Sequence, residues 1–477
     1  MRHYTSASVL ASAVPFLVWS TLLGPLSGCS QREVTGEDPE ACGDTLDELS
    51  LVANRPWDVL FVIDNSASMR QEQDSLAANF QRFIDVFENN LPEGRPDLHI
   101  GVISTDVGAG ENPHTGCSNA GDNGALQSGG SQCSGLENAF LIDRANVDGT
   151  RTQNFVGELG DAFSCIAQLG TQGCGFEQPL EAVKRALDGS QPGNNGFLRE
   201  DAYLLLVFIT DEDDCSAHDD AVFGLSTGAP DDPLGPLTSF RCFEFGVQCE
   251  PDDPRTPGVK GDCRPRQDSP YLQHIDRYID FFHGLKEDPS QVLAAAIVGD
   301  RDPVEVRDDG IGGLVLAPSC STVNGDATPP VRLAAFIDSF GDRGVMSRIC
   351  DEDLSGALTE IGQRAVDVSV PCLHGDLWDA DGDPQNGVQP ECSVVETPRP
   401  AGSGFTVTWP LCDHPETPSN GDCYVLEERA ECTDTPTGLA IRLLRDPEAG
   451  SQPRPFADLE LRCVTELTPG GCLAQMQ

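Results

Sequence analysis

The sequence predicts an α/β fold with a doubly wound, mostly parallel sheet, followed by a small disulfide-rich β module. Three observations predict it. Apolar runs rich in Val, Ile and Leu occur at 59–63, 202–209 and 292–298, and such runs are typical of strands buried on both faces. Segments with apolar residues three or four apart lie between them, which indicates helices that connect parallel strands. After Cys372, prolines and period-two alternation replace the helical spacing.

The expected elements alternate along residues 51–370. A strand at 59–63 is followed by a helix with apolar positions from Leu76 to Leu91, and a second strand spans 98–104. The further expected elements are a short strand at 140–143, helices at 155–169 and 180–187, a strand at 202–209, a helix at 271–286, a strand at 292–298, and helices at 331–340 and 354–366. Residues 107–135 and 221–270 are expected to be long surface loops, and residues 371–477 form the predicted β module.

The start of the chain has the pattern of an export signal. Residues 1–28 combine Arg2 with an apolar run, which is typical of a secretory signal peptide. Residues 26–29, Leu-Ser-Gly-Cys, resemble a bacterial lipobox, and the resemblance implies lipidation of Cys29 as the only membrane attachment. Ser30 follows the lipid cysteine, and enteric sorting rules then indicate the outer membrane of a Gram-negative envelope. An uncleaved membrane helix is the alternative. Residues 29–50 are polar and are interpreted as a tether.

The formal net charge of −47 excludes two classes of partner. Nucleic acids and anionic lipid surfaces are both bound through basic patches, which a chain with 77 acidic and 30 basic residues does not favour. We interpret the excess of acid mainly as surface solubility.

The cysteines indicate an oxidising compartment. Besides Cys29 there are 18 cysteines, an even number that is typical of a disulfide framework in an exported chain. The sequence has no Cys-x-x-Cys pair, so a zinc site is disfavoured. Local pairs are expected between Cys117 and Cys133, Cys215 and Cys242, and Cys249 and Cys263. Further candidates are Cys320 with Cys350 on either side of a helix, Cys165 with Cys174, and Cys42 with Cys372.

A candidate metal site lies where the first predicted strand ends. Asp64, Ser66 and Ser68 follow that strand at alternate positions and offer one charged and two neutral oxygens. Such hard ligands suit Mg²⁺ or Mn²⁺, with Ca²⁺ as a further candidate, and leave a position open for a ligand from outside. Asp211 ends the strand at 202–209, and the carboxyl ends of neighbouring strands meet at one edge of a doubly wound sheet. The alternative is that these residues only cap a helix or turn.

Residues 64–69, Asp-Asn-Ser-Ala-Ser-Met, resemble the metal-ion-dependent adhesion site of von Willebrand factor A (vWA) domains, and the chain resembles bacterial vWA lipoproteins over residues 51–370. The resemblance implies that the strand ending at Asp211 lies beside the first strand, with the sheet order reversing between them. It also implies a threonine ligand from a Gly-rich turn, where this chain has Cys174. Thr171, three residues earlier, is a possible substitute, and Glu177 stands three residues later.

These observations favour a binding protein over an enzyme. The sequence contains no His-Glu-x-x-His, no Gly-x-Ser-x-Gly and no phosphate-binding glycine loop. The first hypothesis is a cell-envelope lipoprotein whose divalent cation captures an acidic side chain of a protein partner. The second is a structural envelope protein that uses the vWA fold without metal. The presence of Cys174 where the vWA pattern has a threonine ligand favours this second hypothesis.

Overall fold

The computed structural model describes residues 45–466 of the 477-residue chain, with gaps at 52–54, 92–94, 130–132, 134, 137, 147–149, 227–231, 311–312, 323–324, 370–371, 374–391, 399–406, 413–420, 430–431, 433–434, 436 and 445–456. The signal peptide at 1–28, the lipidation site Cys29, Cys42 and most of the tether therefore lie outside the described residues. The predictions made for them remain predictions.

The central sheet has seven strands in the order β14-β9-β6-β2-β3-β4-β5. Their bounds are β2 Trp57–Ile63, β3 Leu98–Ser104, β4 Leu141–Ala145, β5 Arg151–Gln153, β6 Tyr203–Ile209, β9 Val292–Val298 and β14 Gly344–Arg348. The strands from β14 to β3 are parallel, whereas β4 and β5 pair antiparallel at one edge. The predicted mixed but mostly parallel sheet is confirmed.

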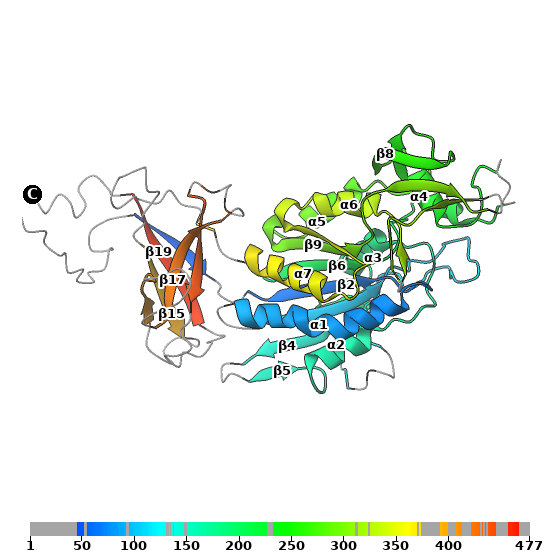
Figure 1. Ribbon diagram of the computed structural model, residues 1–477. Helices are drawn as coiled ribbons and strands as arrows, with labels where there is room; N and C mark the ends of the chain where they lie inside the picture. Colours follow the sequence, from blue (N-terminus) through cyan, green and yellow to red (C-terminus); the bar gives the residue numbers. More distant parts are fainter. Residues whose placement is uncertain are drawn as a thin grey trace, which may run out of the picture. The chain divides into compact units, whose positions relative to one another are not determined.

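Helices cover both faces of this sheet (Figure 1). On one face, α1 (Arg70–Asn90), α2 (Leu159–Ala167) and α7 (Ser355–Val368) pack against alternate residues of β2. The rings of Phe80 and Phe163 stack there with their centroids 3.7 Å apart, and both contact Phe61 of β2. On the other face, α3 (Pro179–Leu187), α5 (Asp276–His283) and α6 (Val331–Asp338) share one apolar cluster with Leu60 and Val62 of β2. Burial on both faces is why β2 reads as an unbroken apolar run.

The region predicted as a loop at 221–270 contains regular elements. The helix α4 (Phe240–Gly246) is followed by β7 (Val247–Glu250) and β8 (Gly258–Pro265), which join β10 (Val304–Asp308) and β11 (Leu314–Leu316) in a small antiparallel sheet. Phe240, Phe243, Val304 and Val306 form its apolar core. The sequence pattern misses these elements because each is short and its partners come from a segment about 50 residues away.

Smaller elements connect these parts. They are the 3-10 helices η3 Pro192–Asn194, η4 Asp220–Phe223, η5 Pro289–Gln291 and η6 Gly341–Arg343, and the strand pair β12 Cys320–Ser321 and β13 Asp326–Ala327.

The C-terminal region is a β module, as predicted. Its four-stranded sheet has the order β1-β19-β15-β16, and β17 pairs with β18. The bounds are β1 Thr45–Leu51, β15 Cys392–Pro398, β16 Val407–Trp409, β17 Cys423–Glu428, β18 Leu439–Leu444 and β19 Ala457–Glu466. Residues 45–50 were predicted to be the end of a tether, but β1 pairs antiparallel with β19. This partner lies about 400 residues along the chain, so no local pattern reveals it.

The described residues form eight disulfides: Cys117–Cys174, Cys133–Cys165, Cys215–Cys242, Cys249–Cys263, Cys320–Cys350, Cys372–Cys432, Cys392–Cys463 and Cys412–Cys423. The predicted pairs Cys215–Cys242, Cys249–Cys263 and Cys320–Cys350 are confirmed. The predicted pairs Cys117–Cys133, Cys165–Cys174 and Cys42–Cys372 are wrong. Proximity in sequence misleads here because the fold lays the loop at 107–135 against both the Gly-rich turn and α2.

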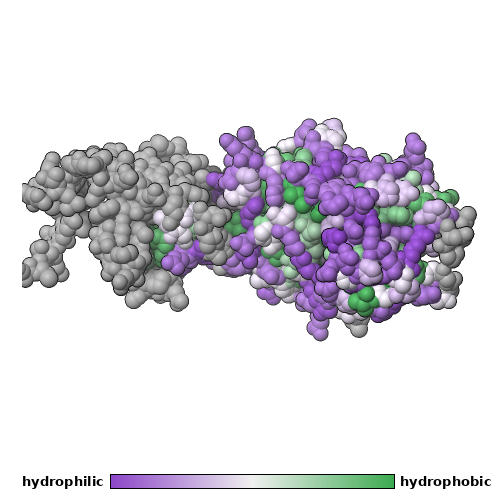
Figure 2. Space-filling model, turned by 90° about the horizontal axis from the view of Figure 1, so that it is seen from above, coloured by the Kyte–Doolittle hydropathy of each residue, from purple (hydrophilic) through white to green (hydrophobic). Residues whose placement is uncertain are grey.

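The surface agrees with the acidic composition. The face drawn in Figure 2 is mostly hydrophilic over the described residues, with small scattered apolar patches. Within the described part of the chain, no helix is both long and apolar enough to cross a membrane.

Candidate metal centre

The carboxyl ends of β2, β3 and β6 meet at one edge of the sheet. Ile63 of β2 is in register with Ser104 of β3 and Ile209 of β6. The backbone N–H of Asp64 donates to the carbonyl of Ile209 at 2.9 Å, and that of Thr105 donates to the carbonyl of Ile63 at 3.3 Å. The residues that follow the three strands are therefore fixed beside one another.

Asp64 is completely buried in this edge. Its Oδ1 accepts a hydrogen bond from the N–H of Ser66 at 2.7 Å, and its Oδ2 accepts one from Oγ1 of Thr210 at 2.8 Å. The hydroxyl oxygens of Ser66 and Ser68 are 3.1 Å apart. Helix α1 begins after Met69 without a side-chain cap hydrogen bond, so neither serine caps this helix, whereas the Asp64 carboxylate caps the turn at Ser66.

Asp211 lies beside Asp64, as predicted. It directly follows Thr210, whose hydroxyl binds Asp64, and its own backbone carbonyl accepts from the N–H of Thr328 at 2.8 Å. Burial raises the pKa of the Asp64 carboxyl, and the charge of Asp211 raises it further. Burial also raises the pKa of Asp211, against the effect of the Ser68 hydroxyl. The four predicted ligands are thus brought together.

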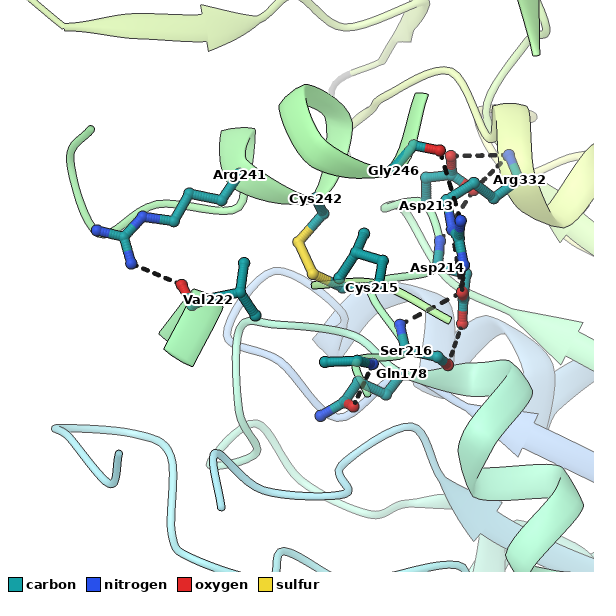
Figure 3. Close-up of a disulfide and its surroundings, with 12 residues drawn as sticks. Gln178, Asp213, Asp214, Cys215, Ser216, Val222, Arg241, Cys242, Gly246 and Arg332 are labelled. Atoms are coloured by element: carbon teal, nitrogen blue, oxygen red, sulfur yellow. Dashed lines mark hydrogen bonds and ion pairs between the residues drawn. A yellow bond between two sulfur atoms is a disulfide. The ribbon is translucent and has the colours of Figure 1, made fainter. Parts of the chain in front are cut away.

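The loop after Asp211 is held by a buried network, drawn in Figure 3. Arg332 of α6 and Asp214 form an ion pair at 3.0 Å, and both side chains are fully buried. Asp214 also accepts from the hydroxyl of Ser216 at 2.6 Å and from the N–H of Leu180 at the start of α3 at 3.2 Å. The Cys215–Cys242 disulfide ties the same loop to α4. The acids at 213 and 214 therefore support the loop.

Asp213 has a similar role at the start of α6. Its carboxylate accepts hydrogen bonds from the N–H groups of Arg332, at 2.9 Å, and Leu333, at 3.0 Å. Burial raises the pKa of Asp213 to about 6, and these backbone hydrogen bonds oppose the rise. A carboxylate at a helix N-terminus also interacts favourably with the helix dipole.

The order of the strands defines the fold class. From β2 the chain moves outward to β3, β4 and β5, then crosses to β6 on the other side of β2 and continues to β9 and β14. The sheet order thus reverses between β2 and β6, with Asp64 and Asp211 at the reversal, which is where open α/β sheets bind ligands. The domain has a doubly wound, mostly parallel α/β fold, consistent with a von Willebrand factor A or Rossmann-like domain.

No protein-family model matches the sequence, and no curated protein does. Among solved structures, a von Willebrand factor type A protein from Catenulispora acidiphila matches with a TM-score of 0.27 and 11% identity, over 90% of this chain and 63% of that one. The pilus adhesin SpaC from Lactobacillus rhamnosus GG matches with a TM-score of 0.30 and 9% identity, over 87% of this chain and 40% of that one. The pilus adhesin RrgA from Streptococcus pneumoniae matches with a TM-score of 0.27 and 11% identity, over 88% of this chain and 58% of that one.

This chain spans less than two thirds of the length of each of these three structures. At such TM-scores the likeness carries no argument about function. The doubly wound fold is shown by the chain's own strand order.

At Cys174 the structure differs from the vWA pattern, which has a threonine ligand at this position. Cys174 is fully buried in its disulfide with Cys117, so it offers no ligand to the vWA site. The Thr171 hydroxyl accepts a long hydrogen bond of 3.4 Å from Arg70 at the surface. Cys174 is therefore excluded from the role of the vWA threonine, and that role for Thr171 stays a prediction.

Glu177 is the site residue that the sequence reasoning missed. Its side chain is 1% exposed, and its Oε2 accepts a hydrogen bond from the hydroxyl of Thr105 at the end of β3. Burial raises its pKa well above the usual range, and the charges of Asp64, Glu212 and Asp211 act in the same direction. A glutamate just before a helix with proline at its first position looks like an ordinary first-turn acid, so the sequence contains no stronger signal.

Several oxygens at this edge are buried without a partner. Among the described residues, these include Glu72 Oε2, Glu177 Oε1 and Asp211 Oδ1. None of the carboxylates of Asp64, Glu72, Glu177, Asp211 and Glu212 forms an ion pair with a basic residue in the described part of the chain. A buried polar atom without a partner costs about 1–3 kcal/mol, and more when it is charged. A divalent cation among these oxygens would satisfy them, so the residues present fit a metal ion.

Other described residues help to define the site. Gln73 of α1 donates to the carbonyls of Asp64 and Gly170, each at 2.9 Å, and so ties the Gly-rich turn to β2. A cavity of about 180 Å³ adjoins the acids and is lined in part by Glu212, Thr328 and Phe243. No group of three or more His, Cys, Asp and Glu residues in the described ranges has the arrangement of a metal site. A cation at this edge would therefore depend on the serine hydroxyls as well as on carboxylates.

Proposed function

We propose that this protein is an exported binding module whose vWA domain holds a divalent cation at Asp64, Ser66, Ser68 and Asp211 and uses it to bind a protein partner. The observation that carries the proposal is the set of unpartnered buried carboxylate oxygens beside the hydroxyls of Ser66 and Ser68, which lie 3.1 Å apart, at the reversal of the sheet order. Carboxylates and hydroxyls are hard oxygen ligands, which suit Mg²⁺, Mn²⁺ or Ca²⁺.

The chemistry of the site supports capture of an acidic side chain. Ser68 is exposed, so the cation would be reached from solvent on that side. A carboxylate from the partner would complete the coordination, while Asp64, anchored by Ser66 and Thr210, keeps the ion in place. The partner is accordingly a protein surface with an exposed Asp or Glu.

The setting of the module is part of the proposal. The eight disulfides support an exported protein, because such bridges persist in oxidising compartments. The lipobox at residues 26–29 would anchor the chain by a lipid on Cys29, in the outer membrane of a Gram-negative envelope.

A second function has one specific observation in its favour. Because Cys174 is locked in a disulfide where the vWA pattern has a threonine ligand, the fold could serve as a metal-independent scaffold in the envelope. In that case the acids at the sheet edge would remain protonated, and no cation would change the stability of the domain.

Thermal unfolding with added cations separates the two functions. We expect Mg²⁺, Mn²⁺ or Ca²⁺ to raise the unfolding temperature of chelator-treated protein, because an ion that binds only the folded state stabilises it. At a free ion concentration 100 times the Kd, the gain is about 2.7 kcal/mol.

Asp64→Asn is the test variant, because it removes the charge but keeps the size of the side chain. Asp161→Asn, on the exposed side of α2, is the matched control. The proposal requires the cation-induced rise to disappear in Asp64→Asn and to persist in Asp161→Asn. Equal behaviour of wild type and both variants would support the scaffold instead.

A further inference from the structure

We propose that the cavity next to Asp211 receives a basic side chain, lysine or arginine, of the protein partner, and that Glu212 pairs with its charge. The cavity has a volume of about 180 Å³ and lies between the loop after β6, the helix α4 and the strand β11. The inference rests on the proposed function only in taking the occupant to belong to a protein partner. Binding in this cavity needs no cation.

The cavity adjoins the candidate metal centre through two of its lining residues. Glu212 directly follows Asp211 in the chain. Thr328, which also lines the cavity, donates its N–H to the carbonyl of Asp211 at 2.8 Å. The Cys215–Cys242 disulfide holds α4 to the same loop (Figure 3). A side chain in the cavity would therefore lie next to the place where the partner's acidic side chain is proposed to bind.

One part of the cavity wall is apolar. Phe240 and Phe243 of α4 line it together with Val315 and Leu316 of β11. Both phenylalanines are buried, whereas Val315 is 39% exposed, so the cavity is reached from solvent on the side of β11. Lysine and arginine bury their methylene groups along such apolar surfaces, and their cationic ends are attracted to aromatic rings. The wall therefore suits the stem of a long basic side chain.

Glu212 is the acid in the cavity wall that has no charged partner among the described residues. The other acid, Asp213, is occupied by backbone N–H groups at the start of α6. Glu212 accepts a hydrogen bond from the hydroxyl of Ser239, and the charged groups that act on it, Asp211 and Asp64, are negative. None of the described lining residues is basic. A cationic group from outside would supply the missing partner through a charge-assisted hydrogen bond.

The size and charge of the cavity disfavour other occupants. Pockets for small organic ligands usually have about 300–1,000 Å³, whereas a cavity of about 150 Å³ holds one benzene molecule, so this cavity has the size of a single side chain. An acidic side chain would be repelled by Glu212, and an apolar one would leave its carboxylate without water or a partner. The net charge of −47 also attracts basic surfaces. The partner is therefore expected to carry a basic residue near its exposed acidic residue.

The test is saturation-transfer NMR of the full chain in EDTA with three probes, the amides of Nα-acetylated lysine, norleucine and glutamate. Norleucine has the apolar stem of lysine without its charge. The lysine probe should bind about 10-fold or more tightly than the norleucine probe, because a hydrogen bond between charged groups is lost with the ammonium group. The glutamate probe should not bind. In Glu212→Gln, the preference for lysine over norleucine should disappear.

Two further pairs of variants locate the binding. Val315→Trp fills the cavity and should weaken binding of the lysine probe by about 10-fold or more. Its matched control is Val259→Trp, because Val259 lies in the same small sheet, is 68% exposed and does not line the cavity. Glu250→Gln, which removes an exposed carboxylate of β7, is the control for Glu212→Gln. Both controls should bind the lysine probe as wild type does.

Each contrary outcome overturns the inference. Equal binding of the lysine and norleucine probes would exclude a role for the charge, and absence of binding would exclude the cavity. Lysine binding that persists in both Glu212→Gln and Val315→Trp would be general attraction to the acidic surface. Should Glu212→Gln not fold, the comparison of lysine with norleucine in wild type and in Val315→Trp decides.

The experiment also separates this inference from the proposed function, because it is carried out without a cation. Lysine binding in the cavity together with a failed cation titration would reject the metal site alone. Cation binding without lysine binding would reject the present inference alone.

Discussion

At the scale of single residues, the site combines groups whose charged forms are opposed by burial. Asp64 and Glu177 are fully enclosed, and Asp211 is nearly so. Burial raises the pKa of Glu212 to about 8, and the charges of Asp211 and Asp64 contribute to the rise. Burial and the Asp211 charge raise the pKa of Asp64 to about 7, so without a cation Asp64 and Glu212 would hold protons part of the time near neutral pH, and a bound cation would favour their ionised forms. The residues are thus suited to a switch between a proton and a metal ion.

This has a consequence for the pH dependence of stability. A carboxyl whose pKa is raised in the folded state binds more protons when folded, so stability falls as the pH rises from its unfolded pKa to its folded pKa. For Glu212 that window runs from 4.5 to about 8. We expect the unfolding temperature in chelator to decrease between pH 5 and pH 8, and saturating Ca²⁺ to reduce the decrease.

Scanning calorimetry at pH 5, 6.5 and 8 measures this effect. An unfolding temperature in chelator that increases over the window would contradict the assignment of raised pKa values to the site. Asp161→Asn should follow the wild-type curve in both conditions, because its side chain is exposed and distant from the sheet edge.

Residues of this kind were only partly predictable from sequence. Asp64, Ser66, Ser68 and Asp211 could be found because each follows a strongly apolar run or a known motif. Glu177 could not be assigned a role, because its partner Thr105 and its neighbour Asp64 are 72 and 113 positions away and only the fold brings them together. Thr171 is a reasonable substitute by residue type, and its hydroxyl accepts a hydrogen bond from Arg70.

At the scale of elements, the loop after β6 is held rigid by α6. Arg332 donates to Asp214 and also to the carbonyl of Gln273 at 2.8 Å, so one buried guanidinium joins three segments. This support lies three residues from Asp211. A cation site needs its ligands held in place, and buried networks of this kind supply that rigidity.

Removing this support should be costly. Arg332→Met leaves the carboxylate of Asp214 buried and unpaired, and we expect the free energy of unfolding to fall by about 3–5 kcal/mol. The matched control is Arg301→Met, because Arg301 forms an exposed ion pair with Asp338 at the end of the same helix. Exposed pairs contribute about 0–1 kcal/mol, so the control should stay near wild type. Urea unfolding of both variants measures the difference, and equal losses would refute a special role for the buried pair.

The elements themselves differ in how well the sequence reveals them. The strands β2, β6 and β9 can be predicted from their own residues, because both faces of each strand are apolar and the sequence shows an unbroken apolar run. The strands β14 and β8 have few apolar residues and depend on neighbours distant in sequence, so periodicity does not find them. Strand β1 is the extreme case, since its partner β19 is the last described strand of the chain.

At the scale of the whole molecule, disulfides join loops that the sheet brings to the same edge. Cys117–Cys174 closes a segment of 57 residues, whereas Cys249–Cys263 closes one of 14 within a hairpin. The spacing of cysteines along the sequence predicts a short-range disulfide such as Cys249–Cys263, but it does not predict a long-range one such as Cys117–Cys174. The net charge of −47 and the hydrophilic face in Figure 2 agree with an exported protein that acts at its surface.

The two disulfides provide a test of how the site is built. Replacing Cys117 and Cys174 by serine should lower the free energy of unfolding by about 4 kcal/mol, and replacing Cys249 and Cys263 by about 3 kcal/mol, by loop-closure entropy. Only the first pair of substitutions should also diminish the cation-induced rise in unfolding temperature, because only this disulfide holds the Gly-rich turn that Gln73 ties to Asp64. A similar loss of the cation effect in both variants would mean that general destabilisation is responsible.

The central claim is that one cation binds where the ends of β2 and β6 meet. A crystal structure of the full chain grown with Mn²⁺ tests it most directly, through the anomalous scattering of the metal. We expect a single strong anomalous peak at coordination distance, about 2.0–2.4 Å, from the carboxylate of Asp64 and from the hydroxyls of Ser66 and Ser68. An ordered site at saturating Mn²⁺ with no anomalous peak beside Asp64 and Asp211 would contradict the account.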